Sequence, residues 1–152
     1  MKKFLKWALV VSFAAAPAVW AASSAPSKEE AVAIVKKAVA ALKTEGKDKV
    51  VSELNTKNGP FHQGELFAFA YDMTGTIIAH PVKKDVVGTN QYNEGDVDGK
   101  KFRKEIIDNA KAGKSGWVTY KYTDPASGKV GTKTTYYEPA GGVVIAAGIV
   151  QN

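Results

Sequence analysis

His80 is one of two histidines in the sequence, and it ends a predicted strand directly before Pro81. An imidazole at that position can donate a hydrogen bond to the carboxylate of a ligand, and its protonated form can also pair with the negative charge. A histidine that only bonds to the backbone at the strand end explains the same position. The residues alone leave both interpretations open, whereas His62 lies in a polar loop and has no comparable support.

Lys133 and Tyr136 lie on one predicted strand and offer an ammonium group and a phenol hydroxyl, both suitable donors for a carboxylate. Side chains three residues apart on a regular strand point to opposite faces of the sheet. Both can therefore line one pocket only if a bulge intervenes or one of them reaches round the sheet edge. We predict the pair as ligand-binding residues on that condition.

Aromatic residues provide candidate walls for such a pocket. Phe67, Phe69 and Tyr71 alternate along a predicted strand, so their rings lie on one face. Trp117 lies on a later strand, and its indole suits either a pocket wall or the core, because both uses bury the ring. We predict Phe69, Tyr71 and Trp117 as part of the binding site, with packing in the core as the alternative for each.

Residue patterns typical of catalysis are absent from the sequence. The chain has no cysteine, which excludes thiol catalysis and zinc–thiolate sites. It contains no nucleophile elbow, phosphate loop or H-E-x-x-H pattern, and Asp124, Glu138 and His80 form no recognisable acid–base set. We predict a binding protein without a cofactor, and an exported enzyme of unknown type is the weaker hypothesis.

An acidic loop from Glu94 to Glu105 has part of the spacing of a calcium site. Five of its residues occupy positions 1, 3, 5, 6 and 12 of the EF-hand pattern: Glu94, Asp96, Asp98, Gly99 and Glu105. Position 1 is glutamate where aspartate is usual, and no convincing helix precedes the loop. A turn in front of a helix explains the same residues, since a helix N-terminus favours nearby acids. We predict no metal site.

Periodicity predicts the elements that position these side chains. Ser27 and Glu30 form a capping box in front of a long amphipathic helix that Gly46 ends, and a second helix is expected at Lys47–Asn55. Five strands and one helix follow, at Leu66–Tyr71, Thr76–His80, Phe102–Ala112 (the helix), Gly116–Tyr122, Val130–Glu138 and Val143–Val150. This order predicts an α+β fold, in which helices flank an antiparallel five-stranded sheet.

The first residues predict export. Lys2, Lys3 and Lys6 precede an apolar run from Trp7 to Val19, which is the layout of a signal peptide. A membrane anchor is the less favoured alternative, because the run is shorter than the roughly 20 residues of a spanning helix and contains a proline.

The expected division of the chain is a signal peptide at 1–21, a linker and helix start at 22–30, and one domain at 31–152; cleavage one residue later is the alternative. Without the three leader lysines the net charge falls from +6 to +3. The domain has a single arginine, Arg103, and its lysines are dispersed. This pattern argues against nucleic-acid binding, which calls for clustered basic residues with stacking aromatics.

Seven short stretches of the sequence form a further pattern: Phe67–Asp72, Gly75–Pro81, Val87–Gly88, Asp98–Phe102, Gly116–Val118, Lys133–Tyr136 and Gly148–Val150. The most specific of them is the strand–turn–strand that ends in Ala79, His80 and Pro81. On these stretches, residues 32–150 resemble a single Cache domain, the PAS-like extracytoplasmic sensor module of chemoreceptors and sensor kinases. Membrane receptors carry the domain between transmembrane helices, whereas this chain is expected to be a freestanding secreted form.

The resemblance implies a five-stranded antiparallel PAS-like sheet with a pocket for short carboxylates or amino acids, and it favours a ligand-binding role for His80. We therefore expect a periplasmic or secreted sensory domain that binds such a ligand reversibly. It would pass the signal, for example in chemotaxis, to a separate membrane receptor or sensor kinase. The alternative is an exported interaction protein that docks on a membrane or periplasmic partner without a functional pocket. A homodimer through the N-terminal helix is a further expectation, although a buried core face produces the same apolar stripe.

Overall fold

Helix α1 (Lys28–Glu45) begins at the predicted capping box. The computed structural model describes residues 25–124 and 126–151; the predicted signal peptide lies outside them. The Ser27 hydroxyl accepts a hydrogen bond from the Glu30 amide, and the Glu30 carboxylate accepts one from the Ser27 amide, at 3.1 and 2.7 Å. Helix α2 (Lys47–Leu54) follows Gly46 directly. Both predicted helices and the capping box are confirmed.

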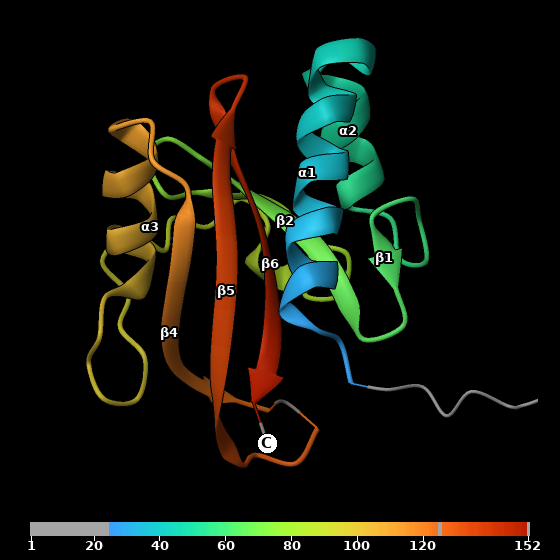
Figure 1. Ribbon diagram of the computed structural model, residues 1–152. Coiled ribbons are helices and arrows are strands. Elements are labelled where there is room, and N and C mark those ends of the chain that lie inside the picture. The colour runs from blue at the N-terminus through green and yellow to red at the C-terminus, as the bar shows by residue number, and fades with distance from the viewer. Residues whose placement is uncertain (1–24, 125, 152) are drawn as a thin grey trace, which may run out of the picture.

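A single antiparallel sheet forms the centre of the molecule (Figure 1). Its strands are β1 (His62–Gln63), β2 (Leu66–Asp72), β3 (Ile77–Ala79), β4 (Gly116–Thr123), β5 (Val130–Ala140) and β6 (Val143–Gln151). They lie in the order β1-β2-β6-β5-β4, and β3 also pairs with β2. The predicted α+β class is confirmed, but the predicted count of five strands is wrong. The sixth, β1, has two residues, which is too short to show any alternation.

Helices α1 and α2 cover one face of this sheet, here called the helix face. The apolar stripe of α1, from Ala31 to Val39, packs there on small side chains such as Ala68, Ala70 and Ala147. Because the chain itself buries this stripe, the stripe no longer indicates a dimer; a homodimer through α1 stays a prediction. No helix in the described ranges is long and apolar enough to cross a membrane.

The opposite face, here called the site face, is covered differently. Helix α3 (Phe102–Lys111) packs on β4 and β5, with Phe102, Ile106 and Ile107 buried. The long connection between β3 and α3 includes a short 3-10 helix, η1 (Lys84–Val86), that periodicity does not predict. The apolar residues of this face form a second core, distinct from the one under α1.

Candidate ligand-binding site

Lys133 is a buried lysine in the middle of the site face. Its side chain is 8% exposed, and on the flanking strands it lies opposite Tyr120 of β4 and Val150 of β6. The aliphatic stem crosses the backbone of Gly148, where a Cβ atom would lie 2.4 Å from Lys133 Cε. A glycine in the interior of a strand often marks such a close approach. The absence of a side chain at Gly148 therefore allows the aliphatic stem of Lys133 to pack directly on the β6 backbone.

The ammonium group of Lys133 has aromatic neighbours but no counter-charge among residues 25–124 and 126–151. Its Nζ atom lies 4.8 Å from the ring centroid of Tyr122 and 5.4 Å from that of Phe67. Among the described residues it forms neither a hydrogen bond nor an ion pair. Burial lowers the pKa of Lys133 to about 8, and the charges of Lys83 and Arg103 act in the same direction. An uncompensated buried cation is costly, and an anionic ligand would offset that cost.

His80 stands beside this group with one ring nitrogen already occupied. Its Nδ1 accepts hydrogen bonds from the backbone amides of Val82 and Lys83, at 3.2 and 2.9 Å. Burial lowers the pKa of His80 to about 4, and the charge of Lys133 is the next largest cause. The ring is therefore neutral at pH 7 and carries its proton on Nε2. Both interpretations of His80 can hold together, since Nδ1 fixes the strand end while Nε2–H can donate to a ligand.

Phe69 and Tyr71 lie on the same face as Lys133 and His80. The Phe69 ring stacks on His80 with 5.6 Å between centroids, and Phe67 lies 5.0 Å from the same imidazole. Tyr71 is 2% exposed, and burial raises the pKa of its hydroxyl while the nearby charge of Arg103 acts in the opposite direction. These rings connect the candidate site with the second core.

Arg103 belongs to this region and was not predicted as a site residue. It lies in the first turn of α3, and its guanidinium carbon is 4.2 Å from the ring centroid of Phe102. Its Nε atom is buried and has no hydrogen-bond partner in the described part of the chain. The sequence feature that could have pointed to Arg103 is that it is the one arginine of the domain and lies at the start of a predicted helix.

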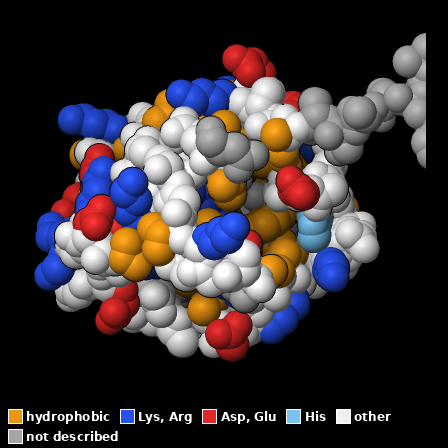
Figure 2. Space-filling model, turned by 90° about the horizontal axis from the view of Figure 1, so that it is seen from below, with side chains coloured by type: hydrophobic (Ala, Val, Ile, Leu, Met, Phe, Trp, Pro, Cys, Tyr) orange, Lys and Arg blue, Asp and Glu red, His pale blue; other side chains and the backbone are white. Residues whose placement is uncertain are grey.

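A cavity of about 890 Å³ opens beside Lys133 at the end of the sheet near the C-terminus. Figure 2 shows this end of the molecule, hollowed, with hydrophobic side chains in its wall and charged side chains around it. The residues that line the cavity around Lys133 include Phe67, Val82, Tyr122, Gly148 and Val150. A second, smaller hollow of about 340 Å³ lies beside Arg103 and Lys83, and Tyr122 lines both.

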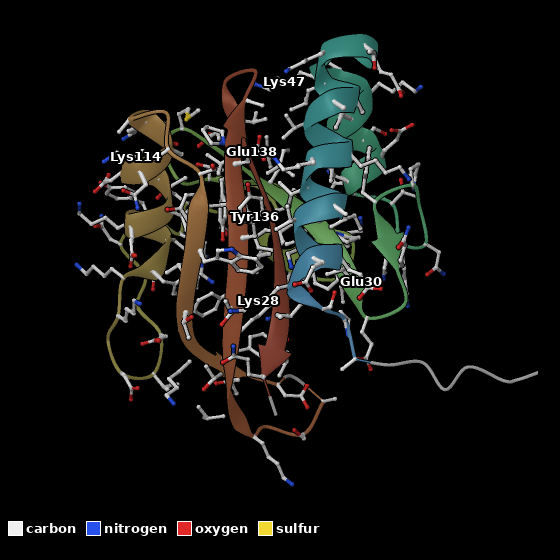
Figure 3. All side chains as sticks on the ribbon, viewed as in Figure 1. Lys28, Glu30, Lys47, Lys114, Tyr136 and Glu138 are labelled. Atoms are coloured by element: carbon white, nitrogen blue, oxygen red, sulfur yellow. The ribbon has the colours of Figure 1, made fainter. Side chains whose placement is uncertain are left out.

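Tyr136 and Trp117 are not brought to this site. The pairing of β4 with β5 runs without interruption, so the bulge that would have turned Tyr136 toward Lys133 is absent. Both side chains lie on the helix face, with 5.2 Å between their ring centroids, and Lys28 lies 5.4 Å from the Trp117 ring. Tyr136 donates a 3.2 Å hydrogen bond to Glu138, and Figure 3 shows both residues on β5.

The acidic loop uses its central carboxylate to hold the backbone. Asp96 accepts hydrogen bonds from the amides of Asp98, Lys100 and Lys121, at 3.0, 2.9 and 2.8 Å. These bonds lower the pKa of Asp96 and tie the loop to β4. Within the described ranges no three acidic or histidine side chains are grouped so that they could hold a metal ion.

Comparisons with known proteins identify the family and the fold. Residues 18–149 match the family model of Single Cache domain 2. Solved structures similar to this chain include a methyl-accepting chemotaxis protein from Vibrio parahaemolyticus RIMD 2210633, with 24% identity, a TM-score of 0.66, and 81% of this chain and 87% of that chain covered. No curated protein matches the sequence.

Two further structures have the same fold. One is a Cache chemosensory domain whose structure describes carboxylic acid recognition, with 18% identity, a TM-score of 0.69, and coverage of 82% of this chain and 92% of that one. The other is the periplasmic sensor domain of a chemotaxis protein, with 20% identity, a TM-score of 0.64, and coverage of 82% and 90%. Since the family model spans most of the sequence, the chain belongs to the Single Cache domain 2 family.

Proposed function

We propose that this chain is an extracytoplasmic sensory domain that reversibly binds a short organic carboxylate in the cavity beside Lys133. The observation that carries this proposal is the buried ammonium group of Lys133, which has no acidic partner among the described residues and faces a cavity of about 890 Å³. A bound carboxylate would supply the missing counter-charge. The similarity to a Cache domain that recognises a carboxylic acid supports the same ligand class.

The proposed roles follow from the positions of the side chains. Lys133 pairs with the carboxylate, and Lys83 and Arg103 add positive potential. His80, whose ring contacts the cavity-lining Phe67, would donate from Nε2, and the Phe69 and Tyr71 rings pack behind that wall rather than in it. We exclude Tyr136 and Trp117 from the binding set, because they lie on the helix face.

The cellular context is proposed on the same basis. Residues 1–21 are a cleaved signal peptide, the domain at 31–152 works outside the cytoplasm, and a separate receptor or sensor kinase receives its signal. The periplasmic sensor domain among the similar structures supports this location.

A thermal-shift screen of the purified chain against short mono- and dicarboxylates and amino acids tests the proposal. A ligand at a hundredfold excess over its dissociation constant stabilises the folded state by about 2.7 kcal/mol, which is easily measured. The shift should vanish in Lys133→Met. The matched control is Lys121→Met, since Lys121 is exposed on the helix face of the neighbouring strand β4. A flat screen on folded protein would instead favour an interaction protein without a functional pocket.

A further inference from the structure

Lys133 has the surroundings of a reactive amine as well as those of an anion-binding group. We propose that Lys133 forms a reversible imine with ligands that carry an aldehyde or ketone group next to a carboxylate. This inference rests on the proposed function, because it places the ligand in the same cavity. It goes beyond that function by naming a covalent bond and a ligand class that an ordinary carboxylate site would not require.

The first support is geometric. The stem of Lys133 is held against Gly148, so the nitrogen is presented at a fixed place in the cavity wall. Many exposed lysines of this chain have an acid or a carbonyl oxygen within reach, as Lys104 has Asp108 and Lys37 has the Pro60 carbonyl. Lys133 has neither in the described ranges, so no internal partner occupies the nitrogen.

The second support is the protonation state of the nitrogen, because only a neutral amine is a nucleophile. With its pKa lowered to about 8 by burial, roughly a quarter of Lys133 is neutral at pH 7.5. An ordinary lysine is neutral to roughly one part in a thousand at that pH. Lys133 thus combines a large neutral fraction with access to a cavity.

The third support is that the site keeps positive charge after Lys133 becomes neutral. Lys83 Nζ lies 5.2 Å from the Tyr122 ring centroid, on the same ring that Lys133 contacts at 4.8 Å. Arg103 lies close enough to affect the pKa of Lys133 and has an unpartnered buried Nε in the described part of the chain. Both groups line the neighbouring hollow rather than the cavity, so they attract the carboxylate by their positive potential through the Tyr122 wall without contacting it.

The proposed step needs no other reactant. The nitrogen lone pair of Lys133 attacks the carbonyl carbon, a C–N bond forms, and the carbonyl oxygen takes the proton that the nitrogen loses. The resulting carbinolamine expels its oxygen as water, and the C=N bond of the imine remains. Water reverses the reaction, so the ligand leaves unchanged, as a reversible sensor requires.

Glyoxylate, the smallest acid with an aldehyde, tests the inference when sodium cyanoborohydride is present to reduce any imine. Reduction adds hydride to carbon and a solvent proton to nitrogen, which leaves a stable carboxymethyl group for peptide mass mapping. We expect Lys133 to be modified at least tenfold faster than Lys121, and glycolate to slow this labelling by competition. Glycolate has the same carboxylate but no carbonyl, so its thermal shift reports ordinary binding.

The variant Lys133→Arg cannot form this imine and should lose the selective adduct. The glycolate-induced thermal shift of the wild-type protein separates the two proposals, because it reports carboxylate binding without an imine. If glycolate shifts the wild-type melting temperature but Lys133 is labelled no faster than Lys121, the imine is wrong and the carboxylate site stands. If glycolate and glyoxylate produce neither a shift nor a selective adduct, both proposals fail for this acid class.

Discussion

The two faces of the sheet share the same strands but differ in what they bury. The helix face packs alanine and branched aliphatic side chains under α1 and α2, and Ala68, Ala70 and Ala147 are all fully buried there. The site face carries aromatic rings, a cavity and a lysine that has no ion-pair partner in the described part of the chain. Because side chains alternate along a strand, one set of backbones can supply a stable core and a polar, less stable binding surface at once.

Strand β5 shows this division most directly. Tyr136 and Glu138 point to the helix face, where Lys36 lies 3.5 Å from the Glu138 carboxylate. Lys133 and Thr135 point to the site face, where the Thr135 hydroxyl bonds to that of Tyr120 at 3.0 Å. The contrast predicts that substitutions on the helix face change only the stability of the fold. Substitutions on the site face can raise the stability while they weaken ligand binding.

The largest effect is expected for Ile145→Ala. Ile145 is fully buried on the helix face, and removing such a side chain costs about 3 kcal/mol of unfolding free energy. Urea denaturation measures the loss, and the carboxylate dissociation constant of the folded protein should not change. For comparison, Val150→Ala on the site face of the same strand truncates a cavity-lining residue that is 48% exposed, so its loss of unfolding free energy should stay at about 0.5 kcal/mol. A binding defect in Ile145→Ala would contradict the division between the faces.

Lys133→Met should raise, rather than lower, the free energy of unfolding of the ligand-free protein. The folded pKa of about 8 lies below the ordinary value of 10.5, so folding disfavours the charged form. That cost is fully present below pH 8 and fades as the pH rises toward 10.5; it amounts to about 3 kcal/mol at most. Methionine removes the charge and keeps the volume, so the urea midpoint at pH 7 should rise while carboxylate binding disappears. Equal or lower stability than wild type would mean that the ammonium is not an uncompensated charge.

The three α-helices, five of the six strands and the order of these elements along the chain could be predicted from local patterns, since each depends on a periodicity or a cap within a few residues. The conflict between Lys133 and Tyr136 was also visible, because alternation alone puts them on opposite faces, as the structure does. Arg103 could not be found this way, because its importance depends on where α3 packs. The short β1 and the role of Gly148 likewise depend on pairing between distant strands.

Acid should lower the stability of the folded protein, because the buried His80 imidazole resists protonation. Its folded pKa of about 4 lies below the ordinary value of 6.5, so the unfolded chain binds a proton first as the pH falls. The contribution of His80 to the free energy of unfolding is fully present above pH 6.5 and is lost between pH 6.5 and pH 4. From pH 7.5 to pH 5 this loss is about 2 kcal/mol. Urea midpoints of the wild type and of His80→Gln at both values of pH isolate this contribution. The same acid sensitivity in both proteins would assign it to other groups.

The smallest effect is expected for Tyr136→Phe, which removes only a hydroxyl from the helix face. That hydroxyl donates to the Glu138 carboxylate at 3.2 Å in a partly buried place, so its loss should cost about 1 kcal/mol or less. Carboxylate affinity should not change, because the sheet separates this side chain from Lys133. Calorimetric titration of Tyr136→Phe and His80→Ala with one carboxylate compares the ligand affinities of a helix-face variant and a site-face variant. A tenfold weakening in the histidine variant alone supports the assigned face, whereas a tenfold weakening in the tyrosine variant would return Tyr136 to the binding site.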